Sequence, residues 1–174
     1  LALAPSILEF YINYIAPYEY EKLDNVQSTT RFGGMENAAC IFYDEDALDG
    51  TRASEALIAH EIVHQWFGNS ATEKDWCHLW LSEGFAIYFE KTKGVSAFRD
   101  RLKKERKTII AFEKRYKSPV VDTAYNSLMD LLNPNSYQKG GWILHMLRNE
   151  LGDEDFHQTI REYYQKYRLS NADT

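Results

Sequence analysis

The pattern of apolar and polar positions divides the 174-residue chain into a short strand-bearing start and a helical remainder. Residues 5–16 predict a short helix, because a proline stands at its start. Residues 18–26 are aromatic-rich and favour a strand, and residues 36–43 alternate as a second strand would. Residues 44–50 are acidic and rich in turn formers, so we expect a loop there.

Two later stretches, residues 52–67 and 79–90, carry apolar side chains around most of the helix circumference. That pattern is typical of buried helices. From residue 96 onward the pattern is helical almost throughout, with breaks near Pro119, at Asn133–Pro134 and at Gly152–Asp153. A small N-terminal sheet followed by a mostly helical lobe indicates the α+β class.

The composition, 44% apolar and 26% charged, is typical of a soluble globular protein of one domain. The net charge of −6 argues against nucleic acid as a partner. Residues 99–117 are an exception, with nine Lys/Arg and three Asp/Glu. Because acids are interleaved there, the stretch favours a solvated helix face over a binding patch.

Features that would fix the compartment are missing from the sequence. No apolar run reaches the roughly 18 residues of a membrane span. The two cysteines, Cys40 and Cys77, are too few for a disulfide framework. The chain opens on Leu1 and not on Met, so we expect a piece of a longer protein, and the localisation stays open.

The first buried helix contains His60-Glu61-Ile62-Val63-His64. Histidines four positions apart lie about 40° apart on one helix face, and such a pair can bind one zinc ion. Glu61 points to a neighbouring face, where it can act on water as a general base without being a ligand. The alternative is a chance pair of core histidines, but buried imidazoles and a carboxylate are costly without partners.

A third ligand candidate, Glu83, follows His64 with 18 residues between them, on the second apolar helix. Its neighbours are apolar, which argues against a surface carboxylate. Gly84 costs that helix about 1 kcal/mol relative to Ala, and a close approach of another helix would explain it. Two His and one Glu leave a fourth tetrahedral position open for water, which indicates metal-assisted hydrolysis of a carbonyl compound, most often a peptide.

Other histidines fit a metal site less well. Cys77 and His78 form a rival pair, but adjacent residues diverge on a helix or strand, so we rank it below the first set. His145 and His157 sit on stretches that look amphipathic, and we interpret both as ordinary.

The spacing from His60 to Glu83 is the pattern of the gluzincins. With Gly33-Gly34-Met35-Glu36-Asn37 placed 23 residues before His60, the chain resembles the M1 family of zinc aminopeptidases, which includes aminopeptidase N and leukotriene A4 hydrolase. Residues 60–69 and 80–86 also match the longer family signature. The resemblance implies that residues 1–174 are a thermolysin-like catalytic domain with one zinc ion per chain. It further implies an N-terminal β domain and a C-terminal helical domain elsewhere in the same longer chain.

The resemblance assigns substrate binding to Gly33, Gly34, Met35, Glu36 and Asn37. In the family the glutamate binds the free α-amino group, the glycines let the substrate backbone approach, and the strand edge pairs with the peptide. An α-amine with a pKa near 7.7–8.0 is largely cationic at neutral pH, so a carboxylate would bind it by a charge-assisted hydrogen bond. Without the zinc motif, Glu36 would be interpreted as a charge that protects a strand edge.

The family also uses a tyrosine hydroxyl beside the zinc to stabilise the oxyanion. Residues 135–141 resemble that site, which assigns the role to Tyr137. Spacing alone does not single it out among 12 tyrosines. Gln138 stands where the family often has Glu.

The function expected from these residues is zinc-dependent hydrolysis of the N-terminal bond of peptides with a free N-terminus. Three alternatives stay open: an epoxide hydrolase of the leukotriene A4 hydrolase type, a non-catalytic family scaffold, and an endopeptidase. Because parts of the substrate pocket belong to other domains in the family, we expect the isolated chain to bind zinc but to cleave poorly.

Overall fold

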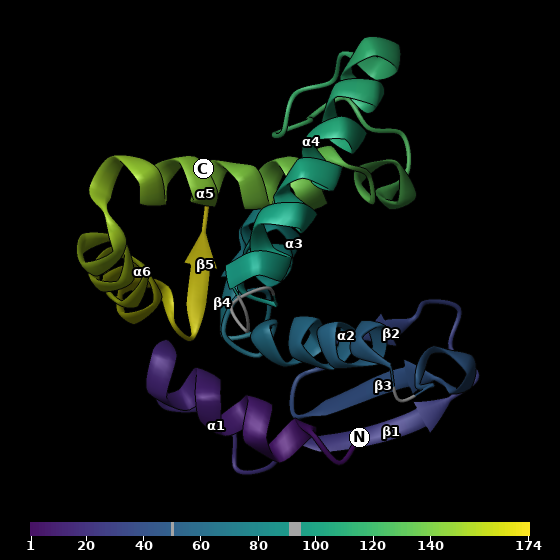
Figure 1. Ribbon diagram of the computed structural model, residues 1–174, viewed down its shortest axis with the longest axis vertical. Helices are drawn as coiled ribbons and strands as arrows, with labels where there is room; N and C mark the ends of the chain where they lie inside the picture. Colours follow the sequence, from purple (N-terminus) through teal and green to yellow (C-terminus); the bar gives the residue numbers. More distant parts are fainter. Residues whose placement is uncertain (50, 91–94) are drawn as a thin grey trace.

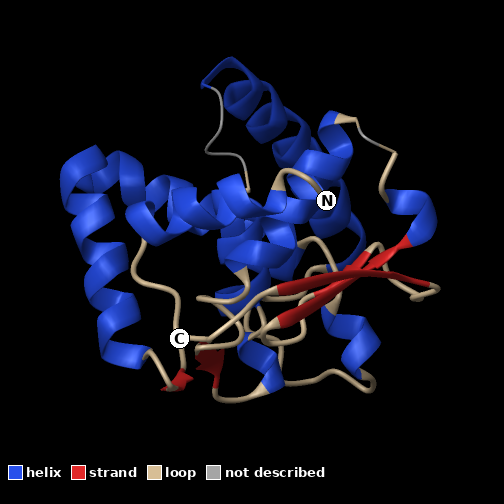
Figure 2. Cartoon of the chain, turned by 90° about the horizontal axis from the view of Figure 1, so that it is seen from below, coloured by secondary structure: helices blue, strands red, loops and turns tan. Residues whose placement is uncertain are grey.

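The computed structural model describes residues 1–49, 51–90 and 95–174 (Figure 1). Three strands form one sheet in the order β1–β3–β2: β1 (Asp24–Ser28) runs parallel to β3 (Cys40–Asp44), and β2 (Gly34–Met35) runs antiparallel to it. A second, parallel pair joins β4 (Ala71–Glu73) to β5 (Ser170–Ala172). Figure 2 shows the strands in separate groups among the helices.

Helices make up most of the remaining described chain, which confirms the α+β prediction. The α-helices are α1 (Ala4–Tyr14), α2 (Arg52–Val63), α3 (Trp80–Phe89), α4 (Val95–Tyr116), α5 (Gly140–Leu151) and α6 (Asp153–Tyr167). Short 3₁₀ turns η1 (Glu45–Ala47), η2 (Trp76–His78) and η3 (Leu128–Leu131) and a π-helical turn, η4 (Asn135–Lys139), connect them.

The core lies around α2 and α3, as their all-round apolar pattern predicts. Ile62 and Val63 of α2 and Ala86 of α3 have no exposed surface. Aromatic rings fill the space between these helices and α6; Phe67 and Phe85 lie 4.5 Å apart between ring centroids. Buried rings of this size contribute much of the apolar area that stabilises the fold.

Helices α3 and α5 cross where glycines from both meet. A Cβ on Gly84 would lie 2.8 Å from the Cα and carbonyl carbon of Gly140. That spacing is shorter than any ordinary contact of a side-chain carbon, so a residue larger than glycine would force the two helices apart. The close helix approach predicted from Gly84 is confirmed, and it holds η4, which leads into α5, beside α3.

Both predicted strands differ from the structure. Residues 18–23 are not a strand, because Tyr18 packs on the buried Trp66, with 5.7 Å between ring centroids, and β1 starts only at Asp24. The stretch 36–43 is not one strand either. Residues 36–39 form the turn between β2 and β3, in which Ala39 takes a φ of +63° and Cys40 N–H donates to the Asn37 carbonyl. Glu36 therefore lies on a hairpin turn, directly after the edge strand β2.

The predicted helices are present in the structure, but some of them end at other residues than predicted. Helix α2 ends at Val63, not at 67, because the chain turns toward Gly68, whose φ is +120°. The stretch 117–127 is not helical, since Lys117 takes a φ of +46° after α4. The break at Gly152 is confirmed by its φ of +81°. Strand β5 was not predicted. The loop expected at residues 44–50 contains η1, and its last residue, Gly50, lies outside the described residues.

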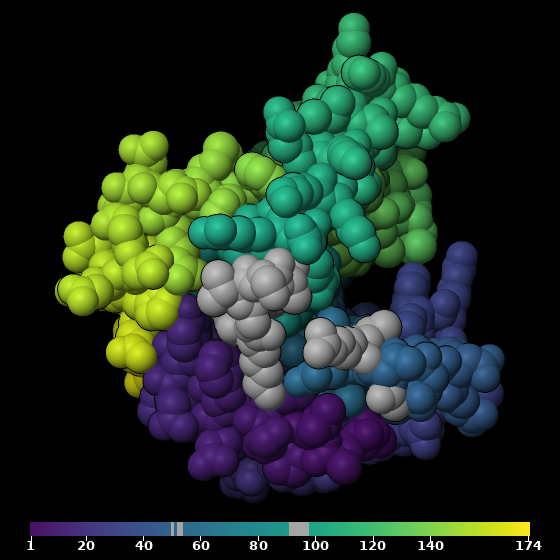
Figure 3. All heavy atoms as spheres, viewed as in Figure 1, coloured from purple at the N-terminus to yellow at the C-terminus, as the bar shows by residue number. Residues whose placement is uncertain are grey.

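Helix α4 projects from the rest of the molecule, and the space-filling view shows a notch between its side and the β2–β3 side (Figure 3). Most described Lys and Arg side chains of α4 are exposed, as expected of a solvated face. Among the described residues, no helix has the length and apolar character that crossing a membrane requires.

Candidate active site

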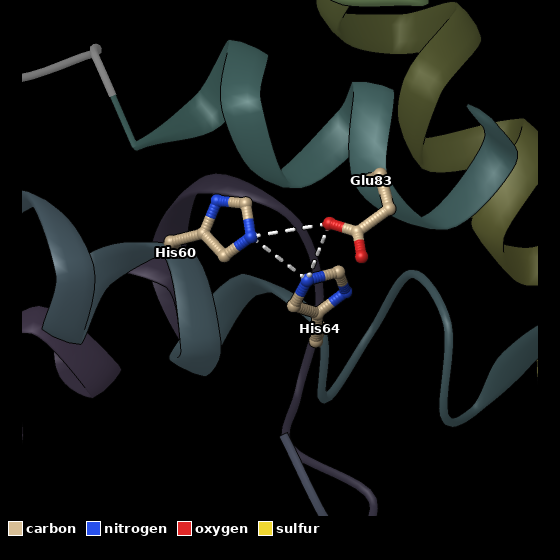
Figure 4. A group of neighbouring side chains, drawn as sticks. All are labelled: His60, His64 and Glu83. Carbon is tan, nitrogen blue, oxygen red and sulfur yellow. Dashed lines mark hydrogen bonds and ion pairs between the residues drawn. The ribbon is translucent and has the colours of Figure 1, made fainter. Parts of the chain in front are cut away.

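His60, His64 and Glu83 converge between α2 and α3 (Figure 4). The Nε2 atoms of the two histidines are 3.1 Å apart, and Glu83 Oε2 lies 3.2 Å from His60 Nε2 and 3.4 Å from His64 Nε2. Donor atoms around a tetrahedral zinc ion, with bonds of about 2.0–2.1 Å, are roughly 3.3–3.4 Å apart. The triangle therefore fits three corners of such a site.

The outer nitrogen of each imidazole is held by a hydrogen-bond acceptor. His60 Nδ1 donates to Glu90 Oε2 at 2.9 Å, and His64 Nδ1 lies 3.1 Å from the Phe67 carbonyl and 2.9 Å from Ser82 Oγ. A carboxylate and a carbonyl can only accept, so the proton is assigned to Nδ1 in both rings. Both Nε2 lone pairs then face the centre of the triangle, the usual arrangement of metal-binding histidines.

The electrostatics of the triangle favour a cation. Burial by itself lowers the pKa of His60 and His64, but the hydrogen bonds and charge of Glu83 outweigh it and raise both pKa values. Burial raises the pKa of Glu83, yet the two histidines hold it well below its usual range. Three electron-pair donors in mutual contact with little exposure fit a bound divalent metal ion.

Glu61 lies beside the triangle, and its buried side chain packs against the backbone of Gly34. A Cβ on Gly34 would lie 2.2 Å from Glu61 Oε1, whereas one on Gly33 would meet nothing closer than Leu57 at 3.9 Å. Burial raises the pKa of Glu61 to about 7, while the charges of His60 and His64 lower it. A carboxyl group with a pKa near neutrality can both accept and return a proton.

Tyr137 comes from the π-helical turn η4 and reaches the same site. Its hydroxyl donates to Glu83 Oε1 at 2.7 Å, and its ring stacks over His60 with 6.4 Å between centroids. Burial first, and then the charge of Glu83, raises the pKa of Tyr137 above its usual range, so the hydroxyl keeps its proton. The widened π turn is a frequent feature of functional sites.

Glu36 is held at the site through its backbone. Its carbonyl accepts hydrogen bonds from Gln65 Nε2 at 3.0 Å and from Asn69 Nδ2 at 2.7 Å. Its carboxylate lies near enough for its charge to raise the pKa of His60, His64 and Glu61. The neighbouring side chains of Met35 and Asn37 are exposed.

The remaining histidines serve elsewhere. His78 Nδ1 contacts Thr174 Oγ1 at 2.9 Å, His157 contacts the Tyr14 hydroxyl, and His145 packs on aromatic rings. Over the described part of the chain, His60, His64 and Glu83 are the only group of three or more close metal-donor side chains. The Cys77–His78 pair lies outside it.

Sequence reasoning missed the residues that support the site. Glu90 stands seven positions after Glu83, about two helical turns, and so shares its face, a signal the sequence offered. Arg101 of α4 forms an ion pair with Glu90, a long-range contact that no local pattern indicates. Gln65 and Asn69 follow the zinc motif directly, but their partner, the Glu36 carbonyl, is set by the tertiary fold.

The chain is similar to a peptidase family model and to known aminopeptidases. The family model described as "Peptidase family M1 domain" matches residues 1–174. Leucine aminopeptidase 2 of Yarrowia lipolytica is 31% identical over 93% of this chain, and endoplasmic reticulum aminopeptidase 1 of Rattus norvegicus is 34% identical over 99% of it.

Solved structures share the fold. Yeast LTA4 hydrolase matches 99% of this chain and 30% of its own, with a TM-score of 0.88 and 24% identity. The M1 zinc metallopeptidase of Deinococcus radiodurans with a Tyr-Ser-Ala substrate matches 97% of this chain and 37% of its own, with a TM-score of 0.79 and 23% identity.

The chain spans only 28% of the Yarrowia protein and 20% of the rat protein. Within that span, the family model covers the whole chain, and the zinc motif, the third donor and the Gly-Gly-Met-Glu-Asn segment meet at one place in the fold. The chain belongs to peptidase family M1.

Proposed function

We propose that this chain is the catalytic part of a zinc aminopeptidase that removes N-terminal residues from peptides with a free α-amine. The observation that carries the proposal is the bond pair between the Glu36 carbonyl and the segment that follows His64. These bonds hold Glu36, to which we assign amine binding, near the His-His-Glu donor triangle. The similar proteins of Yarrowia and rat, both named aminopeptidases, support it.

In this proposal His60, His64 and Glu83 hold one Zn²⁺ per chain. A bound zinc ion supplies Lewis acidity toward a carbonyl oxygen and toward water. The 3.1–3.4 Å spacing of the donor atoms supports this assignment. Glu90 and Ser82, by accepting or sharing the Nδ1 protons, keep both rings turned toward the ion.

The other side chains divide the chemistry between them. Glu61 takes a proton from the attacking water and returns it to the leaving amine, for which its pKa of about 7 is suited. Tyr137 turns its hydroxyl proton from Glu83 to the oxyanion that develops on the scissile carbonyl. Glu36 binds the ammonium group of the substrate. Gly33, Gly34, Met35 and Asn37 lie in β2 or next to it, where the substrate backbone would approach and pair with the edge strand.

We further propose that residues 1–174 form one thermolysin-like catalytic domain of a longer chain. The short span relative to the curated relatives supports this organisation. The other domains of that chain are then partners of this one and complete the substrate pocket.

The test uses two reporter substrates in the full-length protein, a free aminoacyl anilide and its N-acetylated twin, with and without a zinc chelator. We expect the free substrate to be cleaved much faster than its acetylated twin, with cleavage lost on adding chelator and recovered on adding zinc. Equal cleavage of both substrates would refute the role of Glu36, and cleavage of a blocked internal peptide would reveal an endopeptidase. Absence of stoichiometric zinc in the purified protein would favour a non-catalytic scaffold.

A second candidate is an epoxide hydrolase activity of the leukotriene A4 hydrolase type. The fold of yeast LTA4 hydrolase in complex with bestatin, with a TM-score of 0.86 and 26% identity, supports it. Incubation of the full-length protein with leukotriene A4 and measurement of the diol product test it. We expect that activity to depend on the same zinc ligands.

A further inference from the structure

The segment that follows α2, residues 64–71, forms a fixed platform in the core. Asn69 N–H donates to the His64 carbonyl at 3.0 Å, and the next two residues repeat this i→i−5 bond at 3.3 and 2.9 Å. Trp66 and Phe67, 1% and 0% exposed, anchor the segment in the core. The backbone between His64 and Ala71 is thus fixed by its own hydrogen bonds and by two buried rings.

Gln65 and Asn69 extend from this platform to the turn between β2 and β3. Gln65, 1% exposed, holds both ends of that turn: its Nε2 donates to the Glu36 carbonyl at 3.0 Å and its Oε1 accepts from Ala39 N–H at 2.9 Å. Asn69 Nδ2 adds a second bond to the Glu36 carbonyl at 2.7 Å. Two side chains therefore donate hydrogen bonds to the backbone carbonyl of Glu36, the proposed amine-binding residue.

The turn needs such bonds to keep its shape. Ala39 takes a φ of +63°, the left-handed region that a residue with a Cβ enters at a cost. The N–H of the same residue donates to the side-chain Oε1 of Gln65. Without that bond, the turn loses the contact that compensates its strained conformation, and Glu36 is free to shift with it.

We propose that Gln65 and Asn69 are positioning residues that fix Glu36 relative to His64 and so set how far from the N-terminus the enzyme cleaves. Gln65 follows His64 directly in the chain, so one segment carries the proposed metal donor and also holds the turn on which Glu36 lies. A shift of the turn by one ångström would change the distance between ammonium and scissile carbonyl while the donor triangle stays intact. The inference rests on the proposed function and deepens it.

A purely structural role for the two side chains predicts a different result. If they served only to satisfy buried backbone groups, their loss would lower stability and slow the cleavage of every substrate in parallel. If they position Glu36, their loss impairs substrates with a free amine and leaves the slow cleavage of acetylated substrate unchanged. The ratio of the two kcat/KM values separates these roles.

The experiment compares Gln65→Met, Asn69→Ala and the double variant with wild type in the full-length zinc enzyme. The matched control is Ser70→Ala, which removes the bond between Ser70 Oγ and the Tyr164 hydroxyl at 3.0 Å, on the same segment but away from the turn. For each protein, kcat and KM are measured with the free and the N-acetylated substrate, together with zinc content and Tm. We expect the free-to-acetylated ratio to fall about tenfold in each single variant, mainly through KM, and further in the double variant.

Zinc content is expected to stay at the wild-type level in all variants, and Ser70→Ala is expected to lower Tm without changing the ratio. Unchanged ratios in Gln65→Met and Asn69→Ala would overturn the inference while leaving the proposed function intact. A wild-type enzyme that does not prefer the free amine would overturn both. If the double variant does not fold, Asn69→Ala, at a half-buried side chain, decides the question alone.

Discussion

Replacing Gly34 with alanine tests the placement of Glu61 most directly. The added Cβ would lie 2.2, 2.4 and 2.7 Å from Glu61 Oε1, Cδ and Cγ. An ordinary contact requires at least 3.4 Å, so the carboxylate must move by about 1 Å or more. The neighbouring Gly33→Ala is a matched control, because its Cβ would meet only Leu57 at 3.9 Å.

The expected result of Gly34→Ala is a large loss in kcat with little change in zinc binding. Misplacing a catalytic group by about 1 Å costs on the order of 100-fold, and losing general base catalysis costs about 100- to 10,000-fold. We therefore expect kcat to fall about 100- to 1,000-fold, equivalent to roughly 3–4 kcal/mol of transition-state stabilisation. Zinc content should not change, because Glu61 is not one of the three donors.

The assay is steady-state cleavage of a free aminoacyl anilide, with zinc measured by elemental analysis on the same samples. Gly33→Ala is expected to keep kcat within about threefold of wild type. If the two variants lose kcat equally, the contact with Glu61 does not explain Gly34. If both variants instead raise KM at constant kcat, the glycines serve the approach of the substrate backbone, and the reasoning from Glu61 is refuted.

The remaining predictions concern packing, zinc affinity and the oxyanion. Gly84→Ala should destabilise the fold by about 1–3 kcal/mol or more, because its Cβ would lie 2.8 Å from Gly140 backbone; a Tm lowered by several degrees in thermal melts checks this. Glu90→Gln should weaken zinc binding about 10- to 100-fold in chelator competition, since His60 loses its carboxylate partner. Tyr137→Phe should lower kcat about 100-fold at full zinc content. The isolated 174-residue chain should bind zinc but show a much lower kcat/KM than the full-length protein; equal values would refute the need for other domains.

Local patterns were sufficient where the site is built on helices. The placement of the i, i+4 histidines on one face follows from the geometry of a single helix. Gly84 predicted a close helix crossing, and the structure shows that crossing with Gly140. The strand predictions were less accurate, because pairing partners are distant in sequence. Strand β5 pairs with β4 across about 100 residues, and nothing in Ser170–Ala172 alone favours a strand over a loop.

The turn at Glu36 shows why the second half of the site could not be derived from pattern. Alternation extended the strand through residues 36–39, since apolar residues follow there. The structure instead turns at Ala39 because Gln65, 26 positions away, bonds both ends of the turn. A local preference for extended backbone was overridden by a buried side chain whose partner no local rule identifies.

Three glycines leave room for neighbouring groups, each at a different point of the fold, so the effects of filling that room can be separated by mutation. Gly34 lies under Glu61, whereas a Cβ on Gly68 would lie 2.3 Å from Ser82 Oγ and 3.1 Å from His64 Nδ1. A side chain at Gly68 would therefore displace the support of a metal donor, in a backbone already at a φ of +120°. Substitution there should lower zinc affinity first, substitution at Gly34 should lower kcat at full zinc content, and substitution at Gly84 should lower stability. Zinc affinity, kcat and Tm measured for all three variants test whether metal binding, proton transfer and folding depend on distinct contacts. If all three quantities fall together in every variant, they do not.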